Sequence, residues 1–275
     1  MTIKGTTPVA ADPVAAESVA ADPVVAESVA ADPVVADPAI RSIDDNWSKP
    51  VGRLTVGAVP KGAINLNVEG RRLVGPMQGF GRLWQKRYRF VLDTPDLEPR
   101  TLIGIWKAEF ASFWPKGNRF YGPVTGIAPG EVALLNVDAG AHQMLSTGVL
   151  VIYADEESFT FMTPEGHVFA AWITFSAFRE AETTVAHIEV LFRANDPIYE
   201  LLLSLFGSRK EDVFWAATLR NLGARFGVDG QATQTQTLVD RRRQWRNARN
   251  IRHNAALRTG FYTMTHPWIM FRRPS

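Results

Sequence analysis

Residues 196–227 read DPIYELLLSLFGSRKEDVFWAATLRNLGARFG and carry a strong helix signal. Asp196 is a suitable N-cap, and Pro197 occupies the first helical position, where its missing N–H is not needed. Apolar residues then recur at helical spacing until Gly227 supplies a stop. Gly207 interrupts this run before a capping-box pattern that restarts or kinks the helix. The stretch predicts one long amphipathic helix that needs a sheet to cover.

The chain upstream supplies that sheet. A helix with an apolar stripe, predicted over residues 97–112 and ended by Trp114-Pro115, follows the first strand. A Thr163-Pro164-Glu165-Gly166 turn joins two of the later strands as a hairpin. Helices that are segregated from a run of antiparallel strands predict an α+β fold, with a curved antiparallel sheet wrapped on the long C-terminal helix. The predicted strands span residues 82–93, 132–137, 145–153, 158–163, 167–178 and 183–194.

The first 45 residues differ in composition from the rest of the 275-residue chain. Asp-Pro-Val recurs at residues 12, 22 and 32, and the segment carries two cations against eight acids, a charge of −6, so that the remainder carries +8. Proline at every tenth position forbids a long helix, and a segment without aromatic residues buries too little surface to fold. Residues 1–45 are therefore predicted to be a disordered acidic tail. It is either a spacer or a multivalent docking segment for a protein partner such as a shell or scaffold protein.

The remaining chain divides into three predicted parts: a loop-rich lead-in at 46–81, a folded domain at 82–230 and a basic amphipathic extension at 231–275. In the extension, Asp240 is expected to cap a third helix, and residues 240–275 hold nine arginines and one acid. This pattern fits a helix packed on its own domain, with solvated arginines outside. It also fits an anionic membrane surface.

Composition narrows the chemistry. The chain has no cysteine, which removes disulfides and thiolate chemistry. It has no apolar run of about 18 residues for a membrane span and no signal-peptide pattern, so a cytoplasmic location is expected, or a peripheral one at the membrane. Its five histidines lack metal-ligand spacing, so neither a metal nor a cofactor is expected. The basic residues come with no recognised nucleic-acid module, which makes nucleic acid an unsuitable partner.

The element order resembles the helix-grip fold of the START-like superfamily, also called SRPBCC. The resemblance covers about residues 82–228 and is carried by the order from Thr147-Gly148-Val149 to Phe192, followed by Pro197 to Phe226. It implies a cavity between sheet and long helix that takes a hydrophobic small molecule of lipid, polyketide or isoprenoid type. Three stretches further resemble uncharacterised actinobacterial members related to polyketide cyclase/dehydrase-like proteins: Met162-Thr163-Pro164-Glu165-Gly166-His167, Trp172-Ile173-Thr174-Phe175 and Lys210-Glu211-Asp212-Val213-Phe214-Trp215.

Three functions compete. The first is binding or carrying a hydrophobic small molecule in the cavity. The second is a cyclase-like or dehydratase-like enzyme, which needs polar groups such as His167, Glu109 or Arg119 to converge inside the cavity. The third is a peripheral membrane or scaffold-associated protein that uses the acidic tail and the arginine-rich C-terminus. The residues expected to line the cavity are Trp106, Phe110, Phe113, Phe120, Tyr121, Phe161, Phe175, Ile188, Phe214 and Leu222.

Overall fold

The structure is a computed structural model that describes residues 43–140, 143–206 and 209–265. The repeat segment up to residue 42, Gly207 and the aromatic and basic stretch after residue 265 lie outside these residues. What the sequence predicts of them, including the partner-docking role of the tail, stays a prediction.

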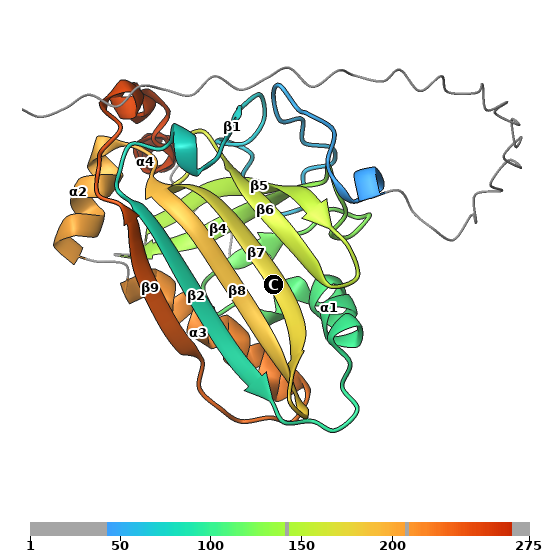
Figure 1. Ribbon diagram of the computed structural model, residues 1–275. Coiled ribbons are helices and arrows are strands. Elements are labelled where there is room, and N and C mark those ends of the chain that lie inside the picture. Colours follow the sequence, from blue (N-terminus) through green and yellow to red (C-terminus); the bar gives the residue numbers. More distant parts are fainter. Residues whose placement is uncertain (1–42, 141–142, 207–208, 266–275) are drawn as a thin grey trace, which may run out of the picture. The chain divides into compact units, whose positions relative to one another are not determined.

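Nine antiparallel strands of the described residues form one sheet, in the order β3-β4-β5-β6-β7-β8-β2-β9, with β1 paired to β6 (Figure 1). All six strand predictions are confirmed, and residues 183–194 form a strand with the predicted bounds. Strands that follow one another in the chain pair from β3 to β8, whereas β2 pairs with β8 on the side away from β7. The strands are β1 (Leu73–Val74), β2 (Leu83–Leu92), β3 (Arg119–Tyr121), β4 (Val132–Gly140), β5 (Gln143–Ala154), β6 (Ser158–Pro164), β7 (Phe169–Glu180), β8 (Thr183–Ala194) and β9 (Thr233–Asp240).

Helices α1 and α3 lie on one face of this sheet, where α3 packs on β2 and α1 packs on β7 (Figure 1). Helix α4 packs on β5. An antiparallel sheet with two helices packed across one face is an α+β architecture and agrees with the predicted helix-grip fold. Among the described residues, none of the helices has the length and apolar character needed to cross a bilayer. The α-helices are α1 (Pro99–Ala108), α2 (Pro197–Phe206), α3 (Arg209–Arg225) and α4 (Ala255–Thr265), and the 3-10 helices are η1 (Ile43–Asn46), η2 (Pro76–Gln78), η3 (Phe110–Phe113) and η4 (Trp245–His253).

The main core fills the space between the sheet and the helices. From β8 it takes the alternate residues Ala186, Ile188, Val190 and Phe192, as the period-2 pattern predicts. Trp215, Leu219 and Leu222 of α3 and Leu102 and Trp106 of α1 pack against them. The sheet is thus covered on this face by two apolar helix stripes.

The long helix predicted over residues 197–226 is confirmed in part, because α2 and α3 occupy this stretch on either side of the interruption predicted at Gly207. Asp196 caps α2 as expected, since its Oδ1 accepts the backbone N–H of Ile198 and of Tyr199 at 2.8 and 3.0 Å. The second helix restarts with Glu211 and Asp212 in its first turn, where carboxylates suit the positive end of the helix dipole. The helix predicted over 97–112 likewise divides into α1 and the 3-10 turn η3.

The prediction of a helix that starts at Asp240 is wrong. Residues 233–240 form β9, which pairs with β2 and extends the sheet beyond residue 230, the predicted end of the domain. Asp240 ends this strand, where its Oδ2 accepts the buried guanidinium of Arg193 at 2.7 Å. The chain then continues through η4 into the short helix α4. The Thr-Gln alternation of β9 lacks the apolar residues that mark a strand with one buried face.

The lead-in covers the opposite face of β4 and β5. Leu54 and Val68 are buried there against Leu134 and Leu150, in a second, smaller core. The approach is so close that a Cβ at Gly148 would lie 2.8 Å from the Val68 side chain. Because both faces of β5 are covered, this strand is apolar at both parities.

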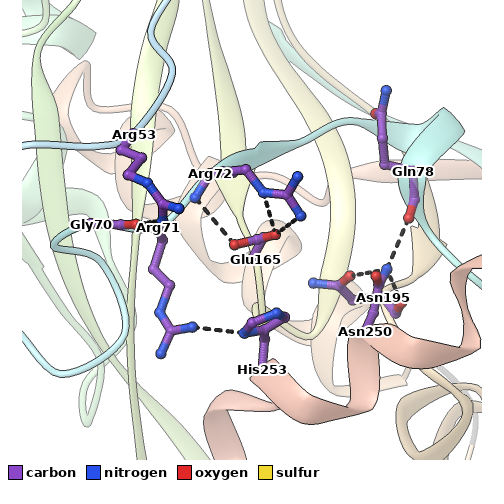
Figure 2. Close-up of polar contacts among 9 residues, drawn as sticks. All are labelled: Arg53, Gly70, Arg71, Arg72, Gln78, Glu165, Asn195, Asn250 and His253. Atoms are coloured by element: carbon purple, nitrogen blue, oxygen red, sulfur yellow. Dashed lines mark hydrogen bonds and ion pairs between the residues drawn. The ribbon is translucent and has the colours of Figure 1, made fainter.

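Polar contacts hold η4 to the lead-in and to Asn195, the residue after β8 (Figure 2). Arg71 donates from Nη1 to Nδ1 of His253 at 2.8 Å, and Asn250 donates from Nδ2 to the carbonyl of Gln78 at 2.9 Å. Burial raises the pKa of the Glu165 carboxyl, in the β6–β7 turn, but the hydrogen bonds and charge of Arg72 outweigh burial and leave this pKa below its ordinary value. The extension after residue 240 is therefore attached by specific contacts.

One buried contact joins the starts of α2 and α4. The second carboxylate oxygen of Asp196, Oδ2, accepts Nδ2 of Asn254 at 2.8 Å. Asn254 in turn caps α4, since its Oδ1 accepts the backbone N–H of Leu257 at 3.0 Å. Burial raises the pKa of the Asp196 carboxyl, and its hydrogen bonds oppose that shift. One Asp–Asn pair therefore caps both helices.

Gly166 provides a test of how the extension is attached. Its φ is +89°, and a Cβ there would lie 1.9 Å from the carbonyl oxygen of His253, whereas Gly227, with φ +72°, has open space around it. We expect Gly227→Ala to lower the free energy of unfolding by about 1 kcal/mol, from left-handed strain alone. Gly166→Ala should lower it by about 3 kcal/mol, because the backbone after residue 250 must also move. Urea unfolding measures the free energy, and limited proteolysis within residues 241–265 measures how firmly the extension is attached. Equal costs for the two variants would contradict the attachment.

Candidate functional site

The aromatic residues predicted to line a cavity lie mostly together in the core. Phe214 packs there partly buried, and Tyr121 lies on the other face of the sheet, where its hydroxyl donates to the carbonyl of Gly62 at 2.9 Å. Their role in ligand binding stays a prediction. The other eight are buried in the main core: Trp106, Phe110, Phe113, Phe120, Phe161, Phe175, Ile188 and Leu222.

These rings pack on one another. The ring of Phe110 lies edge-on to those of Phe120, Phe175 and Phe161, with centroid distances of 4.8, 5.1 and 5.4 Å. Phe159 stacks on Phe175 at 4.7 Å. Such offset and edge-to-face contacts are the preferred arrangements of aromatic side chains. The interior between α1, η3 and strands β3 to β7 is thus occupied by the protein's own rings.

A pocket lies at the other end of the interior, between α2 and strands β2, β8 and β9. Its volume is about 370 Å3. Trp84, Phe192 and Leu203 give it an apolar wall, while its polar groups come from α2, from β9 and from Arg82 just before β2. The full lining is Arg82, Trp84, Phe192, Ala194, Glu200, Leu203, Ser204 and Gln236.

Strand register explains this lining. Trp84, Lys86 and Tyr88 are alternate residues of β2 and point to the same face. Gln236 of β9 stands opposite Lys86, and Gln234 stands opposite Tyr88. Residues that face one another in an antiparallel pair project to the same side. The polar strand β9 therefore places amides along the edge of the pocket.

A buried ionic cluster lies next to this pocket. The Lys86 side chain is fully buried, and its Nζ lies 2.5 Å from Oδ1 of Asp212 and 3.1 Å from Oε2 of Glu211. Oδ1 of Asp212 also accepts the Tyr88 hydroxyl at 2.7 Å and the Gln234 amide at 2.9 Å. Lys86 Nζ lies 5.8 Å from the centre of the Phe192 ring, which itself lines the pocket. The cluster thus adjoins the pocket through Phe192 and Gln236.

Burial changes the acidity of two members of this cluster. It raises the pKa of the Glu211 carboxyl, against the opposing effect of Lys86. It also raises the pKa of the Tyr88 hydroxyl, and the neighbouring Glu211 and Asp212 act in the same direction. Tyr88 therefore stays a protonated donor at neutral pH. A cation, a carboxylate and a phenol joined by hydrogen bonds are groups that can orient a substrate or transfer protons.

The charges at the rim of the pocket are paired. Glu200 is buried, and its Oε1 lies 3.0 Å from Nε of Arg243 and 4.0 Å from Nε of Arg82. The pocket consequently offers an apolar wall and hydrogen-bonding groups without a large excess of one charge. A second hollow of about 380 Å3 lies outside the main core, over residues 100–107 and Glu156. It lacks an apolar wall of this kind.

The structure does not bring the three predicted catalytic residues together. Glu109 pairs with Arg225 at the surface, with Nε–Oε2 at 2.9 Å, and this pairing holds the pKa of the Glu109 carboxyl below its usual value. Arg119 is exposed at the start of β3. His167 sits beside the β6–β7 turn, where its Nδ1 accepts the backbone N–H of Phe169 at 3.0 Å. Within residues 43–140, 143–206 and 209–265, no three histidine, aspartate or glutamate side chains are placed to hold a metal ion.

Sequence reasoning missed Lys86 and its partners. A signal was present, because Lys86 shares its parity in the predicted strand with Tyr88, Phe90 and Leu92. A lysine on an apolar face indicates either a buried charge with partners or a strand edge. The identity of the partners required the tertiary structure, since Asp212 lies 126 residues away.

Comparisons with known proteins give structural neighbours only. No family model matches the chain, and no curated protein does. Solved structures that resemble it include TTHA0849 from Thermus thermophilus, with 18% identity, a TM-score of 0.42 and coverage of 51% of this chain and 95% of that one. The Zhui aromatase/cyclase from Streptomyces sp. R1128 has 14% identity, a TM-score of 0.40 and coverage of 52% and 96%. The di-domain aromatase/cyclase StfQ of the steffimycin biosynthetic pathway has 10% identity, a TM-score of 0.43 and coverage of 54% and 53%.

Removal of the buried cation tests the cluster. We expect Lys86→Met to lower the free energy of unfolding by about 3 kcal/mol, because it leaves two carboxyl groups facing each other without their cation. The triple variant Lys86→Met/Glu211→Gln/Asp212→Asn should recover at least half of that loss, since no uncompensated charge remains. Urea unfolding at pH 7 measures both. Additive losses in the triple variant would show that the charges act independently.

The pH dependence of stability tests His167. Burial lowers the pKa of His167 to about 4, so below pH 6.5 the unfolded chain takes up this proton more readily than the folded chain. The free energy of unfolding should fall by about 2 kcal/mol as pH drops from 6.5 to 4. His167→Asn keeps an acceptor for the Phe169 N–H without titrating, so its stability should fall less over this window. Parallel urea-unfolding curves against pH would contradict this assignment.

Proposed function

We propose that this chain binds or carries a largely apolar small molecule with a polar group, in the pocket between α2 and strands β2, β8 and β9. The observation that carries the proposal is the composition of the pocket. Trp84, Phe192 and Leu203 form an apolar wall, and Glu200 and Gln236 converge on the same space. Ligand sites typically combine such a wall with a few placed polar groups, in volumes of about 300 Å3 and above.

The pocket narrows the class of ligand. Because Glu200 is already paired with Arg243, a strongly charged ligand would have to displace an existing ion pair. A neutral hydrogen-bonding group can instead use the amide of Gln236 without such a cost. The proposed ligand is therefore of lipid, polyketide or isoprenoid type, with its polar group toward β9. Membership of the START-like superfamily, and of its actinobacterial branch, is part of the same proposal.

The predicted aromatic wall residues take a second role in this proposal. Phe192 belongs to both the pocket and the main core. A ligand longer than the pocket would have to displace rings beyond Phe192, at the cost of their mutual contacts. The packed rings of Phe110, Phe161 and Phe175 therefore limit the length of ligand that the chain accepts.

A cyclase-like or dehydratase-like enzyme is the second candidate, and the Lys86 cluster favours it. Tyr88 and Asp212 share a hydrogen bond beside the pocket, and a proton donor next to a carboxylate suits acid–base chemistry on an oxygenated substrate. Tyr88→Phe and Asp212→Asn distinguish the two functions. An enzyme would lose turnover with its ligand affinity retained, whereas a carrier would show no turnover to lose.

A bulky residue in the pocket tests the binding function. Ser204 is exposed on α2 and lines the pocket, and its hydroxyl donates to the carbonyl of Glu200 at 2.7 Å. We expect Ser204→Trp to fill the pocket without disturbing the core. Native mass spectrometry of the protein from its natural cells should detect one small apolar compound per chain. The bound fraction should fall at least tenfold in Ser204→Trp.

Ser112→Trp is the matched control for this experiment. Ser112 is also exposed, and its hydroxyl makes the same kind of bond, to the carbonyl of Glu109 at 2.7 Å, far from the pocket. This variant should retain the compound. A wild-type protein that carries nothing, or a Ser204→Trp protein that carries as much as Ser112→Trp, would contradict binding in this pocket.

A further inference from the structure

Helix α2 presents an apolar stripe to solvent. Leu201, Leu202 and Leu205 are 58%, 43% and 66% exposed, and they recur at the spacing of one helix face. The opposite side of α2 is used by the fold, because Tyr199 and Glu200 are buried. Three large exposed leucines on one ten-residue helix form a continuous apolar surface, which is unusual for a surface in contact with water only.

Helix α4 presents a second stripe of the same kind. Leu257, Phe261 and Met264 are 56%, 72% and 82% exposed, at spacings of four and three residues. The other side of α4 is held against the sheet, where Ala255 and Thr259 are buried. Thr259 Oγ1 accepts the Asn67 amide at 3.0 Å. The exposed stripe therefore belongs to an anchored helix.

The two helices lie at the same end of the folded unit (Figure 1). Tyr199 of α2 accepts the backbone N–H of Ala256 at 3.0 Å, and Asp196 and Asn254 join the starts of the two helices. The 3-10 helix η4 packs on α2 and adds the exposed side chains of Trp245 and Ile251. Together α2, η4 and α4 form what we call the apolar end.

The charge of the apolar end is strongly positive. Residues 241–265 contain seven arginines and no acid. Arg243 pairs with Glu200, whereas Arg246, Arg249 and Arg252 are exposed along η4, between the two apolar stripes in the chain. Exposed large apolar residues beside arginines are the pattern of helices that lie in the headgroup layer of an anionic bilayer.

Charge complementarity selects the occupant of this surface. A second copy of the chain would bring arginine against arginine, which opposes association. Anionic lipid headgroups would pair with Arg246, Arg249 and Arg252. The leucines of α2 and Phe261 would insert at the boundary between the headgroups and the acyl chains. We propose that the apolar end docks on an anionic bilayer surface, with α2 and α4 lying in the interface.

This docking gives the pocket a source of ligand, a step that rests on the proposed function. Leu203 and Ser204 of α2 line the pocket, while Leu201, Leu202 and Leu205 of the same helix lie outside it. A bilayer that contacts the outer face of α2 would lie next to the pocket mouth. An apolar ligand then passes between bilayer and pocket over a short distance, without crossing bulk water.

Vesicle flotation of the full chain tests the docking. Wild-type protein should float with vesicles of phosphatidylcholine and phosphatidylserine at a 7:3 ratio, and at least tenfold less with pure phosphatidylcholine. Leu201→Ser/Leu205→Ser should reduce the floated fraction at least tenfold, and so should Arg246→Gln/Arg249→Gln/Arg252→Gln. These side chains are exposed, so unchanged thermal unfolding will confirm that the variants fold.

Val124→Ser is the matched control, because Val124 is fully exposed and lies outside the apolar end. It should float like wild type. Equal flotation with both kinds of vesicle, or a leucine double variant that floats like Val124→Ser, would overturn the proposal. So would a dimer in analytical ultracentrifugation that this double variant abolishes. Ser204→Trp should still float, so failure of ligand binding and failure of membrane docking are separately observable.

Discussion

The contact between Lys86 and the first turn of α3 sets how the helix lies on the sheet. Burying an amine and two carboxyl groups is costly, and the cost is offset only when geometry and hydrogen bonds are good. Tyr88 and Gln234 supply those hydrogen bonds to Asp212. A shift of α3 by one turn would leave a buried cation without its carboxylates. The apolar stripe of α3 tolerates sliding far better, so the ionic contact specifies the register of the helix against β2.

The interior next to β2 changes along the strand from a packed apolar core to a polar cluster and then to the pocket. Leu92 and Phe90 of β2 face the packed core, Tyr88 and Lys86 face the ionic cluster, and Trp84 lines the pocket. The same gradient continues in β9, where amides rather than aliphatic side chains stand opposite β2. The closed, aromatic end stabilises the fold and the mixed end leaves room for a ligand, so stability and binding use different parts of one surface.

Local pattern was sufficient to predict most of the sheet. Strand β8 alternates so regularly that both its ends were predicted, and the α+β class followed from the order of elements. Strand β9 was missed because its threonines and glutamines give no apolar face. Its extended backbone is instead stabilised by pairing with β2. Glu211 and Asp212 in the first turn of α3 bind Lys86, a partner that is remote in sequence and was not predicted. The aromatic residues were recognised as interior, but the pocket was not located. Its walls come from β2, β8, α2 and β9, and their register is a tertiary property.

The carboxylate of Asp196 also has a mechanical consequence. It caps α2 through one oxygen and holds Asn254, the cap of α4, through the other. The two helices thus pivot about one buried point and are not free to tilt independently. Because α2 is also a wall of the pocket, widening the pocket by tilting α2 would strain the start of α4. The Tyr199 hydroxyl of α2 also accepts the backbone N–H of Ala256 in α4, so a tilt of one helix is transmitted to the other through contacts at their first turns.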